Sequence, residues 1–151
     1  MFQTDDLMKF ENIYNAKEIC LFIKRFDCIF PHLKEKIDSY ESYSKKLEKY
    51  ASVVISKIND ELCGILIYYA NNMESKTAYI SLIGVFPNYQ GRGLGELLLD
   101  YCIENSRLNG MKRLSLEVDL DNSSAISFYK RNGFIECGSK STTSIQMTKD
   151  I

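Results

Sequence analysis

Apolar and polar positions along the first third of the chain predict one strand and two helices. Residues 8–13 alternate apolar with polar side chains, the period of a half-buried strand. Residues 16–26 place apolar side chains at helical spacing, which predicts a helix with one buried face. Pro31 then forces a break, and a second helix runs from a cap at Asp38 or Ser39 to about Tyr50.

The middle of the chain reads as three strands and a long helix. Residues 52–58 and 62–69 form a hairpin across a tight polar turn. The run 79–86 is rich in β-branched and aromatic residues, as a buried strand should be. A helix follows with its apolar residues on one face, and Asn109-Gly110 provides its C-terminal cap.

A strand at 111–120, a short helix at 122–131 and a closing hairpin at 134–138 and 143–148 complete the pattern. The order β-α-α-β-β-β-α-β-α-β-β predicts an α/β fold with one mixed, twisted sheet flanked by helices. With no repeat, linker or low-complexity tract, residues 1–151 are expected to form a single domain.

Composition narrows the class of protein. Apolar residues at 45% and charged residues at 26% are ordinary for a soluble globular domain. A net charge of -1 disfavours nucleic-acid binding, because there is no basic excess to displace counterions. The five cysteines show no C-x-x-C pair, and His32 is the single histidine, so no metal site is expected. Neither a signal peptide nor an apolar run of membrane length is found, which predicts a cytoplasmic protein without membrane association.

A glycine-rich turn joins the 79–86 strand to the long helix. Pro87 cannot donate to a sheet and closes the strand, and Gly91, Gly93 and Gly95 leave the backbone bare. A helix that begins this way offers unpaired N–H groups and the positive end of its dipole to a phosphate. The spacing is not that of a dinucleotide fingerprint, since Glu96 occupies the third glycine position, and no G-x-x-x-x-G-K-[ST] is present.

What the spacing does match is Gln90-x-x-Gly93-x-Gly95 after a Val85-x-Pro87 strand end. It resembles the [Q/R]-x-x-G-x-[G/A] loop of the GNAT acetyltransferase superfamily, which holds the diphosphate of acetyl-coenzyme A. The alternative is a glycine-rich turn that only links a strand to a helix.

A second stretch carries the same resemblance. The run Leu116-Glu117-Val118 with Asn122, then Ala125-x-x-Phe128-Tyr129-x-x-x-Gly133-Phe134, looks like the corresponding signature of amine acetyltransferases, including those that modify protein N-termini. The resemblance extends over nearly the whole chain and is sharpest from 79 to 134. It implies an acetyl-coenzyme A-dependent N-acetyltransferase without a metal. The implied cofactor-binding residues are Ile83, Val85, Gln90, Gly91, Arg92, Gly93, Leu94, Gly95, Asn122 and Tyr129.

Strand parity singles out a polar row that contains Glu117. Arg113, Ser115, Glu117 and Asp119 share one face of their strand, which is a solvated outer face unless this strand splays from the 79–86 strand. Ligands settle where neighbouring strands of an α/β sheet diverge, and there Glu117 becomes a candidate general base. Lysine-like amines have a pKa of about 10.4 and must lose a proton before they attack.

Two further groups complete the expected chemistry. A free backbone N–H at the end of the central strand can stabilise the developing oxyanion, and Val85, beside a bulge expected at Gly84, is the candidate. The resemblance makes Tyr129 the general acid that protonates the leaving thiolate; the alternative is a packed helix tyrosine. None of the cysteines lies in either motif, so a cysteine nucleophile is not favoured.

The acceptor is expected to be a small amine, an amino sugar or a peptide amino group. Phe30, His32, Tyr68 and Tyr79 are the candidate acceptor-binding residues, and no run of acidic residues marks a polyamine pocket. A coenzyme A-binding sensor or interaction module without turnover is the competing hypothesis. The length of the acyl group and a homodimeric state, which is common in the family, stay open.

Overall fold

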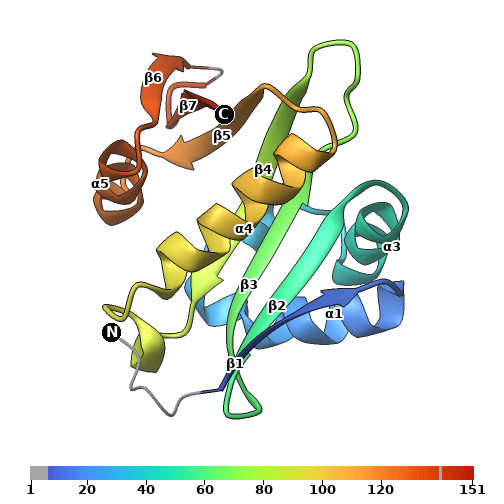
Figure 1. The fold of residues 1–151 in the computed structure, drawn as a ribbon. Helices are drawn as coiled ribbons and strands as arrows, with labels where there is room; N and C mark the ends of the chain where they lie inside the picture. Colours follow the sequence, from blue (N-terminus) through green and yellow to red (C-terminus); the bar gives the residue numbers. More distant parts are fainter. Residues whose placement is uncertain (1–6, 140) are drawn as a thin grey trace.

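A single mixed sheet organises the computed structural model, which describes residues 7–139 and 141–151 (Figure 1). Across these residues the sheet has seven strands in the order β1-β2-β3-β4-β5-β7-β6. Their bounds are Met8–Ile13 (β1), Ser52–Ile58 (β2), Glu61–Tyr69 (β3), Thr77–Val85 (β4), Arg113–Asp119 (β5), Ile135–Gly138 (β6) and Ser144–Asp150 (β7). All neighbouring strands are antiparallel except β4 and β5, which are parallel.

Helices cover both faces of the sheet. The four longer ones are Ala16–Arg25 (α1), Tyr40–Tyr50 (α3), Leu94–Leu108 (α4) and Ser123–Arg131 (α5). Three short helical turns complete the list: Asp27–Ile29 (η1) and Leu33–Lys36 (α2) between α1 and α3, and Pro87–Tyr89 (η2) before α4. This arrangement confirms the predicted α/β fold and adds three short turns to its order. None of the helices in the described part of the chain has the length and apolar character needed to cross a membrane.

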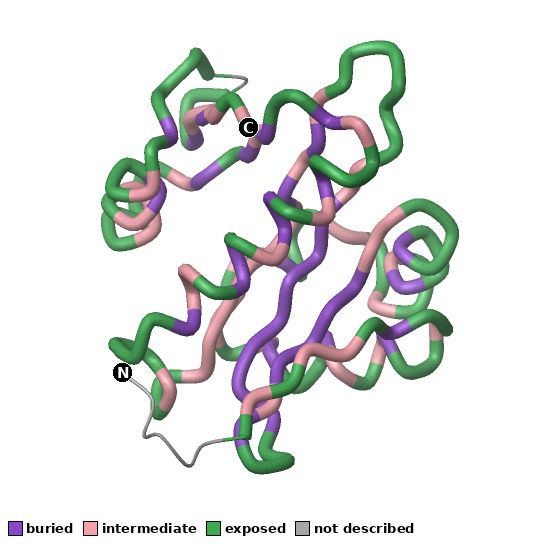
Figure 2. The backbone as a smooth tube through the Cα atoms, viewed as in Figure 1, coloured by how far each residue is buried: buried purple, intermediate pink, exposed green. Residues whose placement is uncertain are grey.

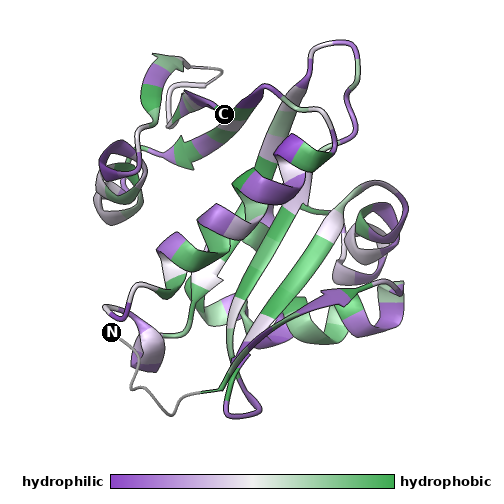
Figure 3. Cartoon of the chain, viewed as in Figure 1, coloured by the Kyte–Doolittle hydropathy of each residue, from purple (hydrophilic) through white to green (hydrophobic). Residues whose placement is uncertain are grey.

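The core consists of two apolar layers, one on each face of the sheet (Figures 2 and 3). One layer joins β2, β3 and β4 to α4 and to Tyr129 of α5, and the other joins β2 and β3 to α1 and α3. On β2, Val54 enters the first layer whereas Val53 and Ile55 enter the second, as strand alternation requires. The central strands are therefore apolar on both faces.

The two halves of the sheet separate between β4 and β5. Their parallel pairing extends only from Thr77–Arg113 to Ile80–Leu116. Beyond that point β4 continues beside β3 as far as Val85, while β5 continues beside β7 as far as Asp119. The predicted splaying of these strands is confirmed, and the unpaired edges face each other across a gap (Figure 1).

A β-bulge lies at the start of this divergence. Ile67 pairs with Leu82 but Tyr68 pairs with Ile80, so Ser81 is the extra residue on β4. In a regular strand Ile80 and Leu82 would point to the same face of the sheet. The bulge reverses this alternation, so Ile80 and Ile83 both belong to the α4 layer, whereas Leu82 belongs to the α1 layer. The expected bulge at Gly84 is therefore wrong, because Gly84 pairs regularly with Ile65.

Candidate active site

Two hollows flank the divergence of β4 and β5 and meet at its mouth. One has a volume of about 660 Å³ and lies against the N-terminus of α4 and one side of α5. The other has a volume of about 580 Å³ and lies on the α1 side of the sheet. Ile29, Phe30 and Asn122 line both, so the hollows adjoin each other at these three residues. We refer to them as the donor cleft and the acceptor hollow.

The glycine-rich loop forms the end wall of the donor cleft. Gly91 and Gly93 have φ angles of 79° and 80°, in the left-handed region that favours glycine, and neither would meet a neighbour if it carried a Cβ. The first hydrogen bond of α4 is donated by the Leu97 amide to the Gly93 carbonyl (3.2 Å), and Gly93 provides no side-chain cap. Among the hydrogen bonds of residues 7–139 and 141–151, none is donated by the amides of 91 to 96.

These free amides give the cleft its chemical character. They lie at the N-terminus of a fifteen-residue helix, where the dipole adds positive potential. The loop therefore has the geometry of an anion site, as its spacing predicted.

Nearly all the predicted cofactor residues line this cleft. They are Ile83, Val85, Gln90, Gly91, Gly93, Leu94, Gly95, Asn122 and Tyr129. Arg92 does not line it, because its guanidinium lies over the ring of Tyr89, 5.4 Å from the centroid. Arg131 of α5 lines the cleft instead, whereas its neighbour Lys130 pairs with Glu136 at 3.0 Å.

Gly95 sets the distance between the two helices that bound the cleft. A Cβ at this position would lie 3.2 Å from Cε2 of Phe128, a tighter contact than side chains ordinarily make. Glycine thus lets the first turn of α4 approach α5 closely. Gly95 is the second residue of α4 and lies outside the left-handed turn, so its role in the loop signature is this close packing.

The backbone of Val85 points toward the cleft. The Phe86 amide donates to the Cys63 carbonyl (2.9 Å), and these residues flank the Val85–Gly64 pair. In an antiparallel ladder such a pair does not exchange hydrogen bonds, so the N–H and C=O of Val85 point away from β3. The side-chain amide of Gln90 donates to the Val85 carbonyl at 2.9 Å. The Val85 N–H, on the same side of the strand, is directed into the gap where β5 has separated from β4.

Tyr129 borders the donor cleft from α5. Its side chain is only 6% exposed and packs edge-on against Phe128 and Phe134. Burial raises the pKa of the Tyr129 phenol well above its ordinary value, with smaller contributions from Cys102 and Tyr79. Tyr129 is therefore a protonated hydroxyl at physiological pH, available as a donor.

The two buried thiols of the core, those of Cys63 and Cys102, also favour the protonated form. Burial raises the pKa of Cys102 to about 12 and also raises that of Cys63. No cysteine lines either hollow within the described residues.

The acceptor hollow brings together three of the four predicted acceptor residues. Phe30, His32 and Tyr79 line it, and the hydroxyls of Tyr43 and Ser81 meet at 3.1 Å in its wall. Tyr68 does not line it: this residue is 3% exposed and packs in the α4 layer. The prediction that Tyr68 binds the acceptor is therefore wrong. Tyr68 pairs with Ile80, and this register turns its side chain toward α4.

Glu117 stands in the same hollow, on the face of β5 that parity assigned to it. The hydroxyl of Ser144 on β7 donates a hydrogen bond to its Oε1. Tyr79 lies across from it, and the pKa of this phenol is raised first by burial and then by the charge of Glu117. The structure thus places Glu117 on the acceptor side of the divergence and Tyr129 on the donor side.

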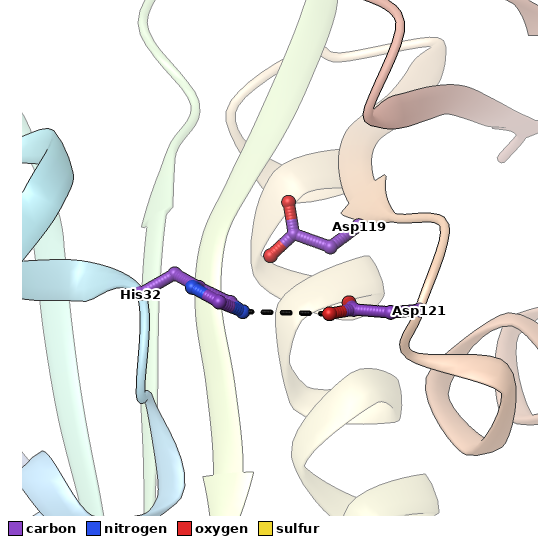
Figure 4. A group of neighbouring side chains, drawn as sticks. All are labelled: His32, Asp119 and Asp121. Carbon is purple, nitrogen blue, oxygen red and sulfur yellow. Dashed lines mark ion pairs between the residues drawn. The ribbon is translucent and has the colours of Figure 1, made fainter.

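Polar side chains bridge the hollow from one half of the sheet to the other. Lys36 pairs with Asp119 at 3.3 Å, and His32 Nε2 lies 3.5 Å from Asp121 Oδ2. Figure 4 shows His32 reaching from the segment before α2 toward both aspartates at the end of β5. Ligand atoms of the three residues lie within 4.8 Å of one another, but an ammonium group already pairs with Asp119, so we assign them to a salt-bridge cluster.

Phe30 stands at the junction of the two hollows. Gly84 admits it there: a Cβ on Gly84 would lie 2.6 Å from Ile29 Cδ1 and 2.7 Å from Phe30 Cζ. These side chains therefore lie directly on the β4 backbone, next to Val85. Ile29 and Phe30 therefore form part of the wall of both hollows.

Several lining residues were not predicted. Strand parity places Asp119 on the face of Glu117, although parity alone does not mark it as a lining residue. Arg131 is open in the sequence to two interpretations, a group that reaches the 3′-phosphate of the coenzyme or a plain surface charge, and the loop 139–144 that contains Ser144 is expected to influence substrate choice. Tyr43, Ser81 and Asp121 line the acceptor hollow without any local signal in the sequence.

Comparison with known proteins decides the family. A model of the acetyltransferase (GNAT) family matches residues 11–134. The chain belongs to this family. It is 27% identical to N-alpha-acetyltransferase 30 of Schizosaccharomyces pombe over 120 residues, 78% of this chain and 76% of that protein. It is 43% identical to the [ribosomal protein bS18]-alanine N-acetyltransferase of Salmonella typhimurium over 54 residues, 36% of each chain.

The fold agrees with this membership. The paia N-acetyltransferase of Thermoplasma acidophilum, solved in complex with coenzyme A, superposes with a TM-score of 0.75 at 16% identity, covering 96% of this chain and 99% of that one. Apart from N-alpha-acetyltransferase 30, the chain spans between 18% and 59% of the length of the curated relatives it matches.

The left-handed glycines of the loop lead to a first prediction. Gly93→Ala should weaken coenzyme A binding by about 5- to 30-fold, because the loop relaxes out of a conformation that costs a side-chain residue roughly 1–2 kcal/mol. Isothermal titration calorimetry with coenzyme A measures this. Gly110→Ala is the matched control: its φ is 83° at the far end of α4, so it should lower stability without changing affinity. Equal losses of affinity in both variants would contradict the assignment.

Proposed function

We propose that this protein is an acetyl-coenzyme A-dependent N-acetyltransferase that uses direct attack by an amine. The observation that carries the proposal is that the donor cleft and the acceptor hollow lie next to each other. Free amides of residues 91 to 96 form the end wall of the donor cleft, carboxylates line the acceptor hollow, and Phe30 lines both. Family membership supports the same reaction class. Acetyl-coenzyme A supplies the acetyl group as an activated thioester.

The residues of the donor cleft suit such a cosubstrate. The amides of 91 to 96 would bind its diphosphate, and the guanidinium of Arg131 adds positive charge on the same cleft. Ile83 and Val85 present the unpaired edge of β4 to an extended amide-bearing arm. The N–H of Val85 is the donor available to a developing oxyanion at the end of that edge.

The acceptor hollow suits a positively charged amine. Glu117, Asp119 and Asp121 all line it, against one lysine and one histidine. A protonated amine is attracted to such a wall before it reacts. The names of two relatives specify N-alpha-acetyl transfer and an alanine of a ribosomal protein, which supports a peptide α-amino group as the first class of acceptor to test, with small amines second.

The protonation states support the division of roles between two residues. Glu117 accepts the proton that the incoming ammonium must lose, directly or through a water molecule. Tyr129, kept protonated by its burial, donates a proton to the leaving thiolate. Each residue acts on its own side of the strand divergence.

A screen of acceptors tests the function. Release of free coenzyme A from acetyl-coenzyme A should rise well above background with at least one class among N-terminal peptides, diamines and amino sugars. Mass spectrometry should find a gain of one acetyl group on the amine. Binding of acetyl-coenzyme A with no release across the whole panel would instead favour a sensor or interaction module.

Tyr129→Phe should lower kcat by about 100-fold, the lower end of the usual contribution of a general acid, while leaving coenzyme A affinity within twofold. Tyr68→Phe is the matched control, since it removes a hydroxyl from another buried tyrosine that lines neither hollow. Steady-state kinetics and calorimetry measure both variants. A Tyr129→Phe enzyme as fast as the unaltered protein would remove this residue from the mechanism.

Glu117→Gln should lower kcat/KM at neutral pH by about 100-fold. The deficit should shrink as the pH rises through the pKa of the acceptor amine, about 8 for a peptide α-amino group and about 10.4 for a lysine-like amine, because the acceptor then arrives already neutral. Rates at a series of pH values measure this, and Glu104→Gln, on the exposed side of α4, is the control. A deficit that stays constant at every pH would point to a different role for Glu117.

A further inference from the structure

The C-terminal hairpin reaches the site through one buried serine. Ser144, at the start of β7, is 2% exposed and pairs with Asp119 of β5 in the sheet register. Its hydroxyl lies diagonally across from Glu117 and donates a hydrogen bond to Oε1 of that carboxylate. A serine from the hairpin between β6 and β7 thus contacts the residue we propose as the base.

The direction of this hydrogen bond is fixed by chemistry. An ionised carboxylate can only accept, so the Ser144 hydroxyl proton points to Glu117. The oxygen of Ser144 then accepts from Ser141 Oγ, which lies 2.8 Å away. The result is a directed pair of bonds that runs from the turn to the carboxylate.

We propose that Ser144 is a positioning residue for Glu117. By holding Oε1, it fixes the rotamer of the carboxylate and leaves Oε2 to accept the proton of an amine in the acceptor hollow. This inference rests on the proposed function, since it assigns a partner to the base of that reaction.

Besides the bond between Ser141 Oγ and Ser144 Oγ, the turn has hydrogen bonds that do not use the Ser144 hydroxyl. The Leu120 amide donates to the Thr143 carbonyl at 2.9 Å, and Ser139 Oγ donates to the Ser144 carbonyl at 2.6 Å. These bonds use the backbone of 143 and 144. The hydroxyl of Ser144 is directed at Glu117 alone among charged groups of the described residues, so its removal should act on catalysis more than on folding.

The test compares kinetics of three variants. Ser144→Ala should lower kcat by about tenfold, the usual value of one hydrogen bond to a charged group, with KM for acetyl-coenzyme A within twofold. Ser144→Thr, which keeps the hydroxyl, should recover most of the rate. Ser139→Ala, which removes a bond that holds the turn but does not touch Glu117, should leave kcat within twofold. A loss as large in Ser139→Ala as in Ser144→Ala would overturn the proposal.

A double-mutant cycle separates this inference from the proposed function. In a Glu117→Gln background, Ser144→Ala should have no further effect on kcat, because the carboxylate it positions is gone. If Glu117→Gln lowers the rate but Ser144→Ala does not, the positioning role fails while the function stands. If Glu117→Gln itself has no effect, the base assignment fails. An undiminished effect of Ser144→Ala in the Glu117→Gln background would also overturn the proposal. Thermal melting with and without coenzyme A confirms that each variant is folded. If Ser144→Ala does not fold, Ser144→Gly takes its place, since it also removes the hydroxyl.

Discussion

The end of pairing between β4 and β5 is the constraint on which the site depends. Four residue pairs join these strands, and after Ile80 and Leu116 each strand keeps only one neighbour. The bulge at Ser81 comes directly after the last pair and turns β4 away. Backbone groups that a continuous sheet would satisfy are left facing a gap, and such groups require water or a ligand.

The two faces of the sheet become two different environments at this gap. Toward α4 and α5, the wall consists of apolar strand residues, free amides and a buried phenol. Toward α1, the wall carries three carboxylates and aromatic rings. A strand divergence in a sheet with helices on both faces therefore produces a cleft lined by free amides beside a hollow lined by carboxylates. Phe30, which the missing side chain of Gly84 admits onto the β4 backbone, marks the boundary.

Residues close in sequence could be predicted well, and contacts that depend on strand register could not. The glycine loop, the cap at Asn122 and the facing of Glu117 follow from local spacing, and the structure has each of them. The position of Tyr68 could not be predicted in this way, because Tyr68 pairs with Ile80 and faces α4 rather than the acceptor hollow. This register depends on the bulge at Ser81, which has no signal in the sequence.

The same limit explains the polar residues that sequence analysis missed. Glu117 and Ser144 are 27 positions apart, and His32 and Asp121 are 89 positions apart. The first pair meets only because β5 and β7 are adjacent although β6 separates them in the chain. Asp119 differs, because it lies two residues from Glu117 and strand alternation alone places it on the same wall.

Separation of the two proposed proton-transfer residues has a physical consequence. Glu117 lies exposed in the acceptor hollow, beside Asp119 and Asp121. Tyr129 lies in an apolar layer, where burial raises the pKa of its phenol. Desolvation disfavours the charged form of an acid, so a buried position suits a group that must stay protonated and an exposed position suits one that must carry charge. The divergence of β4 and β5 provides both kinds of position side by side, one for each role in the proposed reaction.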